Sequence, residues 1–194
     1  MTEADELRAA LRTAAAGLLD TRDASGITVD DVAAAASVSR ADFDRAFDDL
    51  EHVFIAATLG RLEDGLRRVR PVAAQRGDLR EIVHEAACAA LEQVADQETF
   101  YRRVMEAPFK WSATAAIVDF VRTAIHEHPA TFALLQRSSL PSCQAAGAIA
   151  SGLVWMLADW LTSPACGRPG VEVVAGWMTE FILRNAAGDL PAAQ

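Results

Sequence analysis

Residues 28–54 carry the feature that most limits how this chain folds, which is a pair of helix-starting signals eleven residues apart. Thr28 is followed three residues later by Asp31, and Ser39 is followed three residues later by Asp42. A hydroxyl residue with an acidic residue three positions on favours a capping box, in which each side chain bonds the other residue's backbone N–H. The two boxes predict two short helices joined by a tight turn, with a longer helix beginning near residue 49.

The rest of the chain is also patterned for helices. Apolar side chains recur at helical spacing almost everywhere, and no long segment alternates with period two. Further helices are expected over residues 4–20, 49–70, 79–95, 99–107, 112–126, 130–137, 142–161 and 171–187. The fold class is therefore predicted to be all-α.

Composition narrows the class of protein. Apolar residues make up 52% of the 194, which permits a substantial core. No window holds about 18 uninterrupted apolar residues, and the acidic N-terminus does not look like a signal peptide. We expect a cytoplasmic protein that does not enter a membrane.

Motifs for chemistry are missing from the sequence. No nucleophile motif or glycine-rich phosphate loop is present, so an enzyme is not expected. The three cysteines are widely spaced and fit neither a disulfide framework nor a zinc pattern, so we expect them to be buried as small apolar residues. The four histidines show no metal-ligand spacing, and no metal or cofactor is expected.

The spacing after Thr28 suits a helix-turn-helix, whose second helix must enter a DNA major groove about 12 Å wide. Small residues at 33–36 allow the helices to approach closely, and Val38 is the expected turn anchor. Phe43 and Phe47 lie four residues apart and should face inward together. The outward positions of the second helix are then Arg40, Ala41, Asp42, Asp44, Arg45 and Asp48.

This region resembles the TetR family of transcriptional regulators. The match runs through residues 28–33, 36–39, 43–47 and 50–54, and it follows an N-terminal helix. The resemblance implies a helix-turn-helix domain over residues 1–50 and a helical ligand-binding and dimerisation domain over residues 51–194. It also implies that double-stranded DNA is bound by Thr28, Ser39, Arg40, Ala41, Asp42, Asp44 and Arg45.

A homodimer is implied as well, through the helices near 142–161 and 171–187. The first of these is apolar on most faces, so it should be buried on most faces. In a TetR-like dimer these two helices, with Trp177, Phe181 and Ile182, would pair with their copies in a four-helix bundle. Gly147, Ser151 and Gly152 would permit close contact between helices.

A pocket for a small apolar or aromatic ligand is expected among the middle helices. Ordinary core packing remains the alternative for each of these side chains. The candidate ligand-binding residues are His84, Cys88, Phe100, Tyr101, Met105, Phe109, Trp111, Phe120 and Trp155.

The charge of the N-terminal region argues against strong DNA binding. Residues 1–60 hold twelve acidic and five basic side chains, which accounts for most of the formal net charge of −9. TetR-family members usually carry an aromatic residue where this chain has Asp44, a lysine where it has Leu50, and a turn glycine where it has Ser37. DNA affinity normally depends on cations that replace counterions at phosphates. Two hypotheses therefore stay open: a ligand-responsive repressor, or a TetR-like dimer that has lost DNA binding and binds a protein or small molecule.

Overall fold

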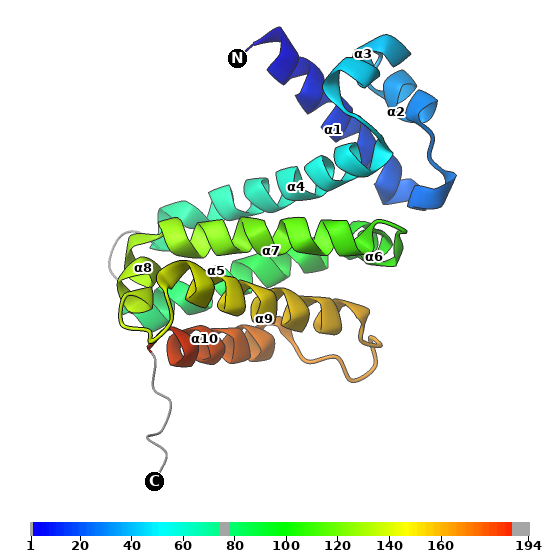
Figure 1. Cartoon of the computed structure of the whole chain (residues 1–194). Helices are drawn as coiled ribbons and strands as arrows, with labels where there is room; N and C mark the ends of the chain where they lie inside the picture. Colours follow the sequence, from blue (N-terminus) through cyan, green and yellow to red (C-terminus); the bar gives the residue numbers. More distant parts are fainter. Residues whose placement is uncertain (1, 74–77, 188–194) are drawn as a thin grey trace. The chain divides into compact units, whose positions relative to one another are not determined.

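A computed structural model describes residues 2–73 and 78–187, and within those ranges every regular element is helical (Figure 1). The all-α prediction is therefore confirmed. The elements are α1 (Glu3–Thr21), η1 (Ala24–Gly26), α2 (Val29–Ala35), α3 (Arg40–Ala46), α4 (Leu50–Ala73), α5 (Leu79–Asp96), α6 (Glu98–Glu106), α7 (Lys110–Glu127), α8 (Pro129–Leu135), α9 (Ser142–Thr162) and α10 (Val171–Ala187). Helix ends agree with the sequence expectations to within about three residues, the range over which such ends fray.

Both capping boxes form as expected. The Thr28 side chain accepts a bond from the Asp31 N–H at 3.2 Å, and the Thr28 N–H donates to Asp31 Oδ2 at 2.8 Å. Ser39 and Asp42 repeat the arrangement at 3.1 and 3.0 Å. Each box satisfies N–H groups that a short helix leaves unpaired at its start. Local sequence thus fixes where α2 and α3 begin.

The turn between α2 and α3 places Ser37 at φ 58°, in the left-handed region. Among the described non-glycine residues it alone has a positive φ. The N–H of Val38 donates to the Ala33 carbonyl at 3.0 Å and closes the turn. In this region a Cβ lies too close to the following carbonyl oxygen, which destabilises every residue except glycine. The serine at the usual glycine position therefore occupies a glycine-like conformation.

The helices group into two compact units. The first contains residues 1–64 and 97–116, and the second contains residues 65–96 and 117–194. In the first unit α1 packs against α2, α3 and α6. Phe43, Phe47 and Phe54 are buried there, as the helical spacing predicted for the first two, and Phe54 stacks on Phe109 with ring centroids 5.3 Å apart.

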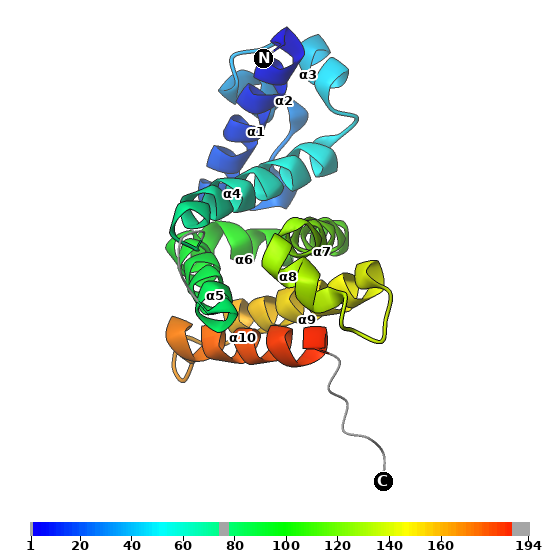
Figure 2. The ribbon, with the colours of Figure 1, turned by 90° about the vertical axis from the view of Figure 1, so that its left-hand side faces the viewer.

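In the second unit α10 lies against α5, α8 and α9 (Figure 2). Its core includes Val83, Leu135, Ala146 and Ile149 from the other helices and Ile182 from α10. This corrects one expectation, because Ile182 belongs to the chain's own core and is not exposed for a partner copy. Phe181 is also packed against that core.

Gly152 of α9 serves the contact with α10 inside the same chain. A Cβ added at Gly152 would come within 2.4 Å of the Phe181 ring. The two helices therefore need a residue without a side chain at position 152 to pack at their present separation.

By length and composition α9 alone among the described helices resembles a membrane span, and 39% of its most apolar window is buried within the chain. Core helices of soluble proteins meet the same criteria. The prediction that α9 is buried on most faces was wrong for the single chain. Ala148, Ser151 and Trp155 form an exposed stripe, with Trp155 71% exposed.

The expectation of three buried cysteines was also wrong. Cys143 and Cys166 are exposed, and Cys88 is half-buried. Cys143 lies in the first turn of α9, and Cys166 lies in the loop that joins α9 to α10. Neither position faces a packed neighbour, so composition alone gave no guide to their burial.

Candidate functional site

The outer face of α3 carries the residues proposed to meet DNA. Arg40, Ala41, Asp44 and Arg45 are exposed, Asp42 is half-buried, and Thr28 and Ser39 cap the starts of α2 and α3. Phe43 and Ala46 face the core. The helix therefore presents the expected residues outward, on a scaffold held by the buried phenylalanines.

The two arginines of α3 are paired with carboxylates of the same unit. The Arg40 guanidinium lies 3.2 Å from Asp30 and 3.2 Å from Asp44. Arg45 is paired with Asp42, whose side chain also closes the Ser39 capping box. Exposed pairs of this kind contribute little to stability, but they place negative charge beside the only cations of α3.

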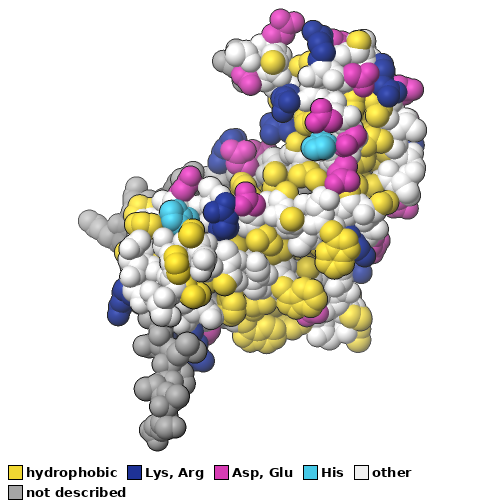
Figure 3. Space-filling model, viewed as in Figure 1, with side chains coloured by type: hydrophobic (Ala, Val, Ile, Leu, Met, Phe, Trp, Pro, Cys, Tyr) yellow, Lys and Arg dark blue, Asp and Glu magenta, His cyan; other side chains and the backbone are white. Residues whose placement is uncertain are grey.

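The hydrogen bonds and ion pairs shift the pKa values of several of these side chains. The hydrogen bonds that Arg40 donates to Asp30 and then to Asp44 raise the pKa of Arg40. The Ser39 hydroxyl and N–H, followed by Arg45, lower the pKa of Asp42. The Thr28 N–H and hydroxyl, followed by Arg22, lower the pKa of Asp31 to about 2. The lowered pKa values keep Asp31 and Asp42 ionised at neutral pH. Acidic and basic side chains mix over the surface of this region (Figure 3).

The start of α4 adds a titratable cation. The His52 ring nitrogen Nδ1 lies 2.8 Å from Asp49, whose side chain also accepts the His52 backbone N–H at 2.9 Å. The bond to Asp49 raises the pKa of His52, and the charges of Asp48 and Glu51 act in the same direction. The sequence did not single out His52, although its position two residues after Leu50 places it at the helix start.

The residues proposed to bind a ligand are divided between the two units. Phe100, Tyr101 and Phe109 are buried in the first unit, Met105 there is half-buried, and Trp111 is 72% exposed. In the second unit His84, Cys88 and Phe120 are half-buried, and Trp155 is exposed. The two exposed tryptophans do not form the wall of an enclosed pocket within the chain, because their side chains face outward.

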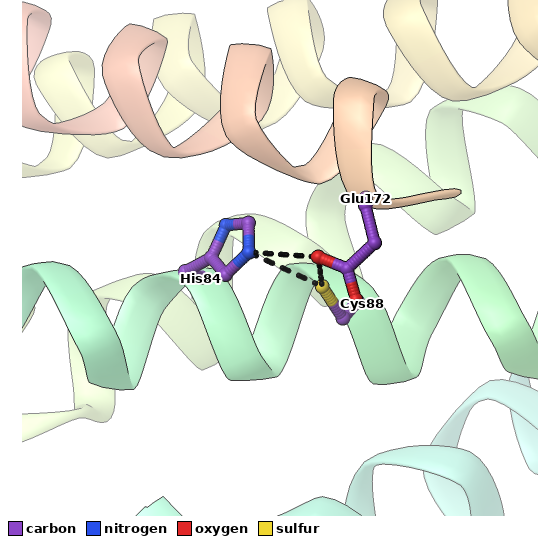
Figure 4. Close-up of side chains that lie close together, drawn as sticks. All are labelled: His84, Cys88 and Glu172. Atoms are coloured by element: carbon purple, nitrogen blue, oxygen red, sulfur yellow. Dashed lines mark hydrogen bonds and ion pairs between the residues drawn. The ribbon is translucent and has the colours of Figure 1, made fainter. Parts of the chain in front are cut away.

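His84 and Cys88 lie together with Glu172, which the sequence did not connect to them (Figure 4). His84 Nε2 is 3.2 Å from Glu172 Oε2 and 3.6 Å from Cys88 Sγ, and Cys88 Sγ is 3.6 Å from Glu172 Oε2. Burial, followed by the charge of Glu172, raises the pKa of the Cys88 thiol to about 11. The four-residue spacing of His84 and Cys88 was a local signal for this cluster, whereas Glu172 is 84 residues further along and gave none.

No protein-family model and no curated protein matches the chain. Solved structures do match, over nearly the whole chain. FadR from Thermus thermophilus, described as a TetR-family transcriptional repressor in complex with lauroyl-CoA, superposes with a TM-score of 0.68 at 17% identity over 96% of this chain and 98% of that one.

The chain has the TetR fold. A TetR-family regulator from Syntrophomonas wolfei matches with a TM-score of 0.62 at 16% identity, covering 97% of this chain and 99% of that one. The TetR-family repressor AlkX from Dietzia sp., implicated in biodegradation of n-alkanes, matches with a TM-score of 0.59 at 20% identity over 92% and 94%. These matches concern the fold of the chain as a whole.

Proposed function

We propose that this chain is a TetR-like transcriptional regulator that binds double-stranded DNA through α3 as a homodimer. The observation that carries the proposal is the doubly capped helix pair, with its left-handed turn at Ser37 and its buried Phe43 and Phe47. This is the geometry a reading helix needs to stand in a major groove while a second helix braces it. Such a protein works in the cytoplasm, where its DNA lies.

Binding through α3 requires an exchange of ion pairs. Arg40 must leave Asp30 and Asp44, and Arg45 must leave Asp42, before either guanidinium reaches a phosphate or a base. Asp42 can instead accept a bond from a cytosine amino group, which is a recognised base contact. We therefore expect modest affinity and a shallow dependence on salt, since few cations are free to displace counterions.

The homodimer is supported by the exposed apolar side chains of α9 and α10. Trp155 is 71% exposed and Trp177 is 53% exposed, and Val173 lies one turn before Trp177. Apolar side chains gather on the surface over α9 (Figure 3). Large exposed aromatic side chains on neighbouring helices are typical of a protein–protein interface. Two α9 helices and two α10 helices would form a four-helix bundle.

A small apolar or aromatic ligand would control the regulator, and we propose that it acts by releasing a repressor from its operator. Support for an apolar ligand comes from FadR with its bound lauroyl-CoA and from AlkX, which is implicated in biodegradation of n-alkanes. Ligand binding releases DNA only if the ligand prefers one arrangement of the two reading helices. The buried Phe100, Tyr101 and Phe109 are the apolar candidates for this contact.

Selection of genomic DNA by the purified dimer tests the proposal. Fragments retained at about 50 mM salt are sequenced, and their affinities are measured over a salt series. The expected result is a palindromic site with half-sites about one helical turn apart, and an affinity that falls with salt but with a shallow slope. Absence of any retained fragment at low salt contradicts DNA binding.

The carboxylates around Arg40 favour a second candidate function, a TetR-like dimer that binds a protein or small molecule without reading DNA. A double variant with Asp44→Tyr and Leu50→Lys restores the two residues usual in the family. Gain of DNA binding by this variant, where the native chain has none, supports the second candidate and its electrostatic explanation. Equal binding by both chains contradicts it.

A further inference from the structure

The cluster of His84, Cys88 and Glu172 brings three different ligand atoms to one point between α5 and α10 (Figure 4). His84 and Cys88 share a face of α5 because they are four residues apart. Glu172 is in the first turn of α10, which packs along α5. The nitrogen, sulfur and oxygen atoms all lie within 4.8 Å of one another. Since Glu172 is largely exposed, the cluster is open to solvent.

The hydrogen bonds of Thr179 indicate which nitrogen of His84 carries the proton. The Thr179 hydroxyl is buried and donates to the Ala175 carbonyl at 2.7 Å. It also lies 3.4 Å from His84 Nδ1. If the single hydrogen of this hydroxyl stays on the Ala175 carbonyl, the hydroxyl accepts from His84, and the proton of the neutral ring lies on Nδ1. In the neutral ring Nε2 then has a free lone pair directed at the cluster.

With the proton on Nδ1, a cation would stabilise the cluster of His84, Cys88 and Glu172. With Nε2 unprotonated, its lone pair faces the Glu172 carboxylate at 3.2 Å, and two acceptors at that distance repel each other. Glu85 and Glu92 add negative charge near Cys88. Positive charge between the three atoms removes the conflict, either as a second proton on His84 or as a metal ion.

The separations agree with one metal geometry. A tetrahedral zinc ion has bonds of about 2.0 Å to nitrogen and oxygen and about 2.3 Å to thiolate sulfur. These bonds place nitrogen and oxygen about 3.3 Å apart and place sulfur about 3.5 Å from each. The observed separations are 3.2, 3.6 and 3.6 Å. A single ion can therefore contact all three atoms with little movement of the side chains.

We propose that His84 Nε2, Cys88 Sγ and Glu172 Oε2 bind a divalent transition-metal ion of the Zn²⁺ class, with water in the fourth position. Nitrogen, thiolate and carboxylate together suit Zn²⁺ better than Mg²⁺ or Ca²⁺, which prefer oxygen alone. The Cys88 thiol releases its proton to solvent when its sulfur binds the metal. Thr179 holds the imidazole through Nδ1, the contact that commonly orients a metal-binding histidine. The ion would join the first turn of α10 to α5.

Cobalt provides the direct test, because Co²⁺ bound by a thiolate absorbs strongly in the near ultraviolet. Full-length protein, prepared without metal under reducing conditions, is titrated with Co²⁺ and then with Zn²⁺. We expect one Co²⁺ per chain, a thiolate charge-transfer band, and displacement of Co²⁺ by Zn²⁺. Cys88→Ser should abolish the band, whereas Cys143→Ser and Cys166→Ser, which change exposed cysteines outside the cluster, should leave it unchanged.

Glu172→Gln keeps the test interpretable if a substitution in α5 disturbs folding, because Glu172 is exposed. It should weaken Zn²⁺ binding by at least about 100-fold, and Thr179→Val should weaken it by about 10- to 100-fold. Zn²⁺ at 100 times its Kd should raise the Tm of the native chain by about 5 to 10 °C, but not that of the Glu172→Gln variant. A Co²⁺ spectrum without the thiolate band, or Zn²⁺ affinity that is the same in Glu172→Gln, overturns the proposal.

Discussion

Two surfaces of the single chain differ in whether their side chains already have partners. One is the outer face of α3, and the other is formed by α9 and α10. On α3 both arginines already contact carboxylates of their own unit, so the charges are balanced without DNA. On α9 and α10 the tryptophans Trp155 and Trp177 remain exposed to water. Exposed apolar area is unfavourable in water, whereas an exposed ion pair is almost neutral in energy. From this difference we expect the proposed association of two chains to be strong and the proposed binding of DNA to be weak and conditional.

The largest expected effect comes from removing the tryptophans. Trp155→Ala with Trp177→Ala should raise the Kd of the proposed dimer by at least about 100-fold, because buried tryptophans commonly dominate an interface. Sedimentation equilibrium over a concentration series measures the change. Trp111→Ala is the matched control, since Trp111 is equally exposed but lies on α7 in the other unit. Unchanged association in the double variant contradicts the assignment of this surface.

The next largest effect is expected when the carboxylates that pair with Arg40 are neutralised. Asp30→Asn with Asp44→Asn frees Arg40 and should raise DNA affinity by about tenfold at low salt, because two repulsive charges are removed close to phosphate. The slope of log affinity against log salt should steepen by about 1 as Arg40 becomes available. Fluorescence anisotropy with the selected DNA measures both.

Glu3→Gln with Glu6→Gln is the control for charge alone. It removes two carboxylates of the same region, neither of which contacts Arg40. If both double variants gain the same affinity and the same slope, total charge rather than the pairing of Arg40 limits DNA binding.

Smaller effects are expected at the helix starts. Thr28→Ala and Ser39→Ala should each lower the free energy of unfolding by about 1 kcal/mol, since each removes one side of a capping box. Thr13→Ala, in the exposed middle of α1, should change it little. Denaturant unfolding followed by circular dichroism compares the three. Equal losses in all of them would show that the caps contribute nothing specific.

The helices α2 and α3 could be predicted from the sequence because their signals are local. The two residues of each capping box, Thr28 with Asp31 and Ser39 with Asp42, are only three positions apart. The four-residue spacing of Phe43 and Phe47 likewise predicts their burial, so neighbouring residues suffice to predict α2 and α3. The pairing of Arg40 with Asp30 depends on how the two helices cross, and the distances between their side chains are absent from the sequence. Local spacing predicts helices, but it does not predict which charges meet.

The second unit shows the same limit over a longer range. His84 and Cys88 were visible as a four-residue pair, but Glu172 joins them only because α10 packs on α5. The three cysteines were expected to be buried because free cysteines usually are. Two are exposed, since they lie at a helix start and in a loop. Positions that depend on packing between distant segments therefore escaped prediction.

The smallest expected effect is at the turn of the helix pair, where Ser37 has φ 58°. Ser37→Gly removes the strain of a Cβ in the left-handed region but adds freedom to the unfolded chain, so the net gain in stability should be about 0.5 to 1 kcal/mol. Ser37→Ala keeps the Cβ and should give no gain. Thermal unfolding of the three chains measures the differences.

Since glycine leaves every charge of α3 in place, Ser37→Gly should not change the DNA affinity. A rise in affinity would mean that the conformation of the turn, and not the pairing of Arg40, limits DNA binding.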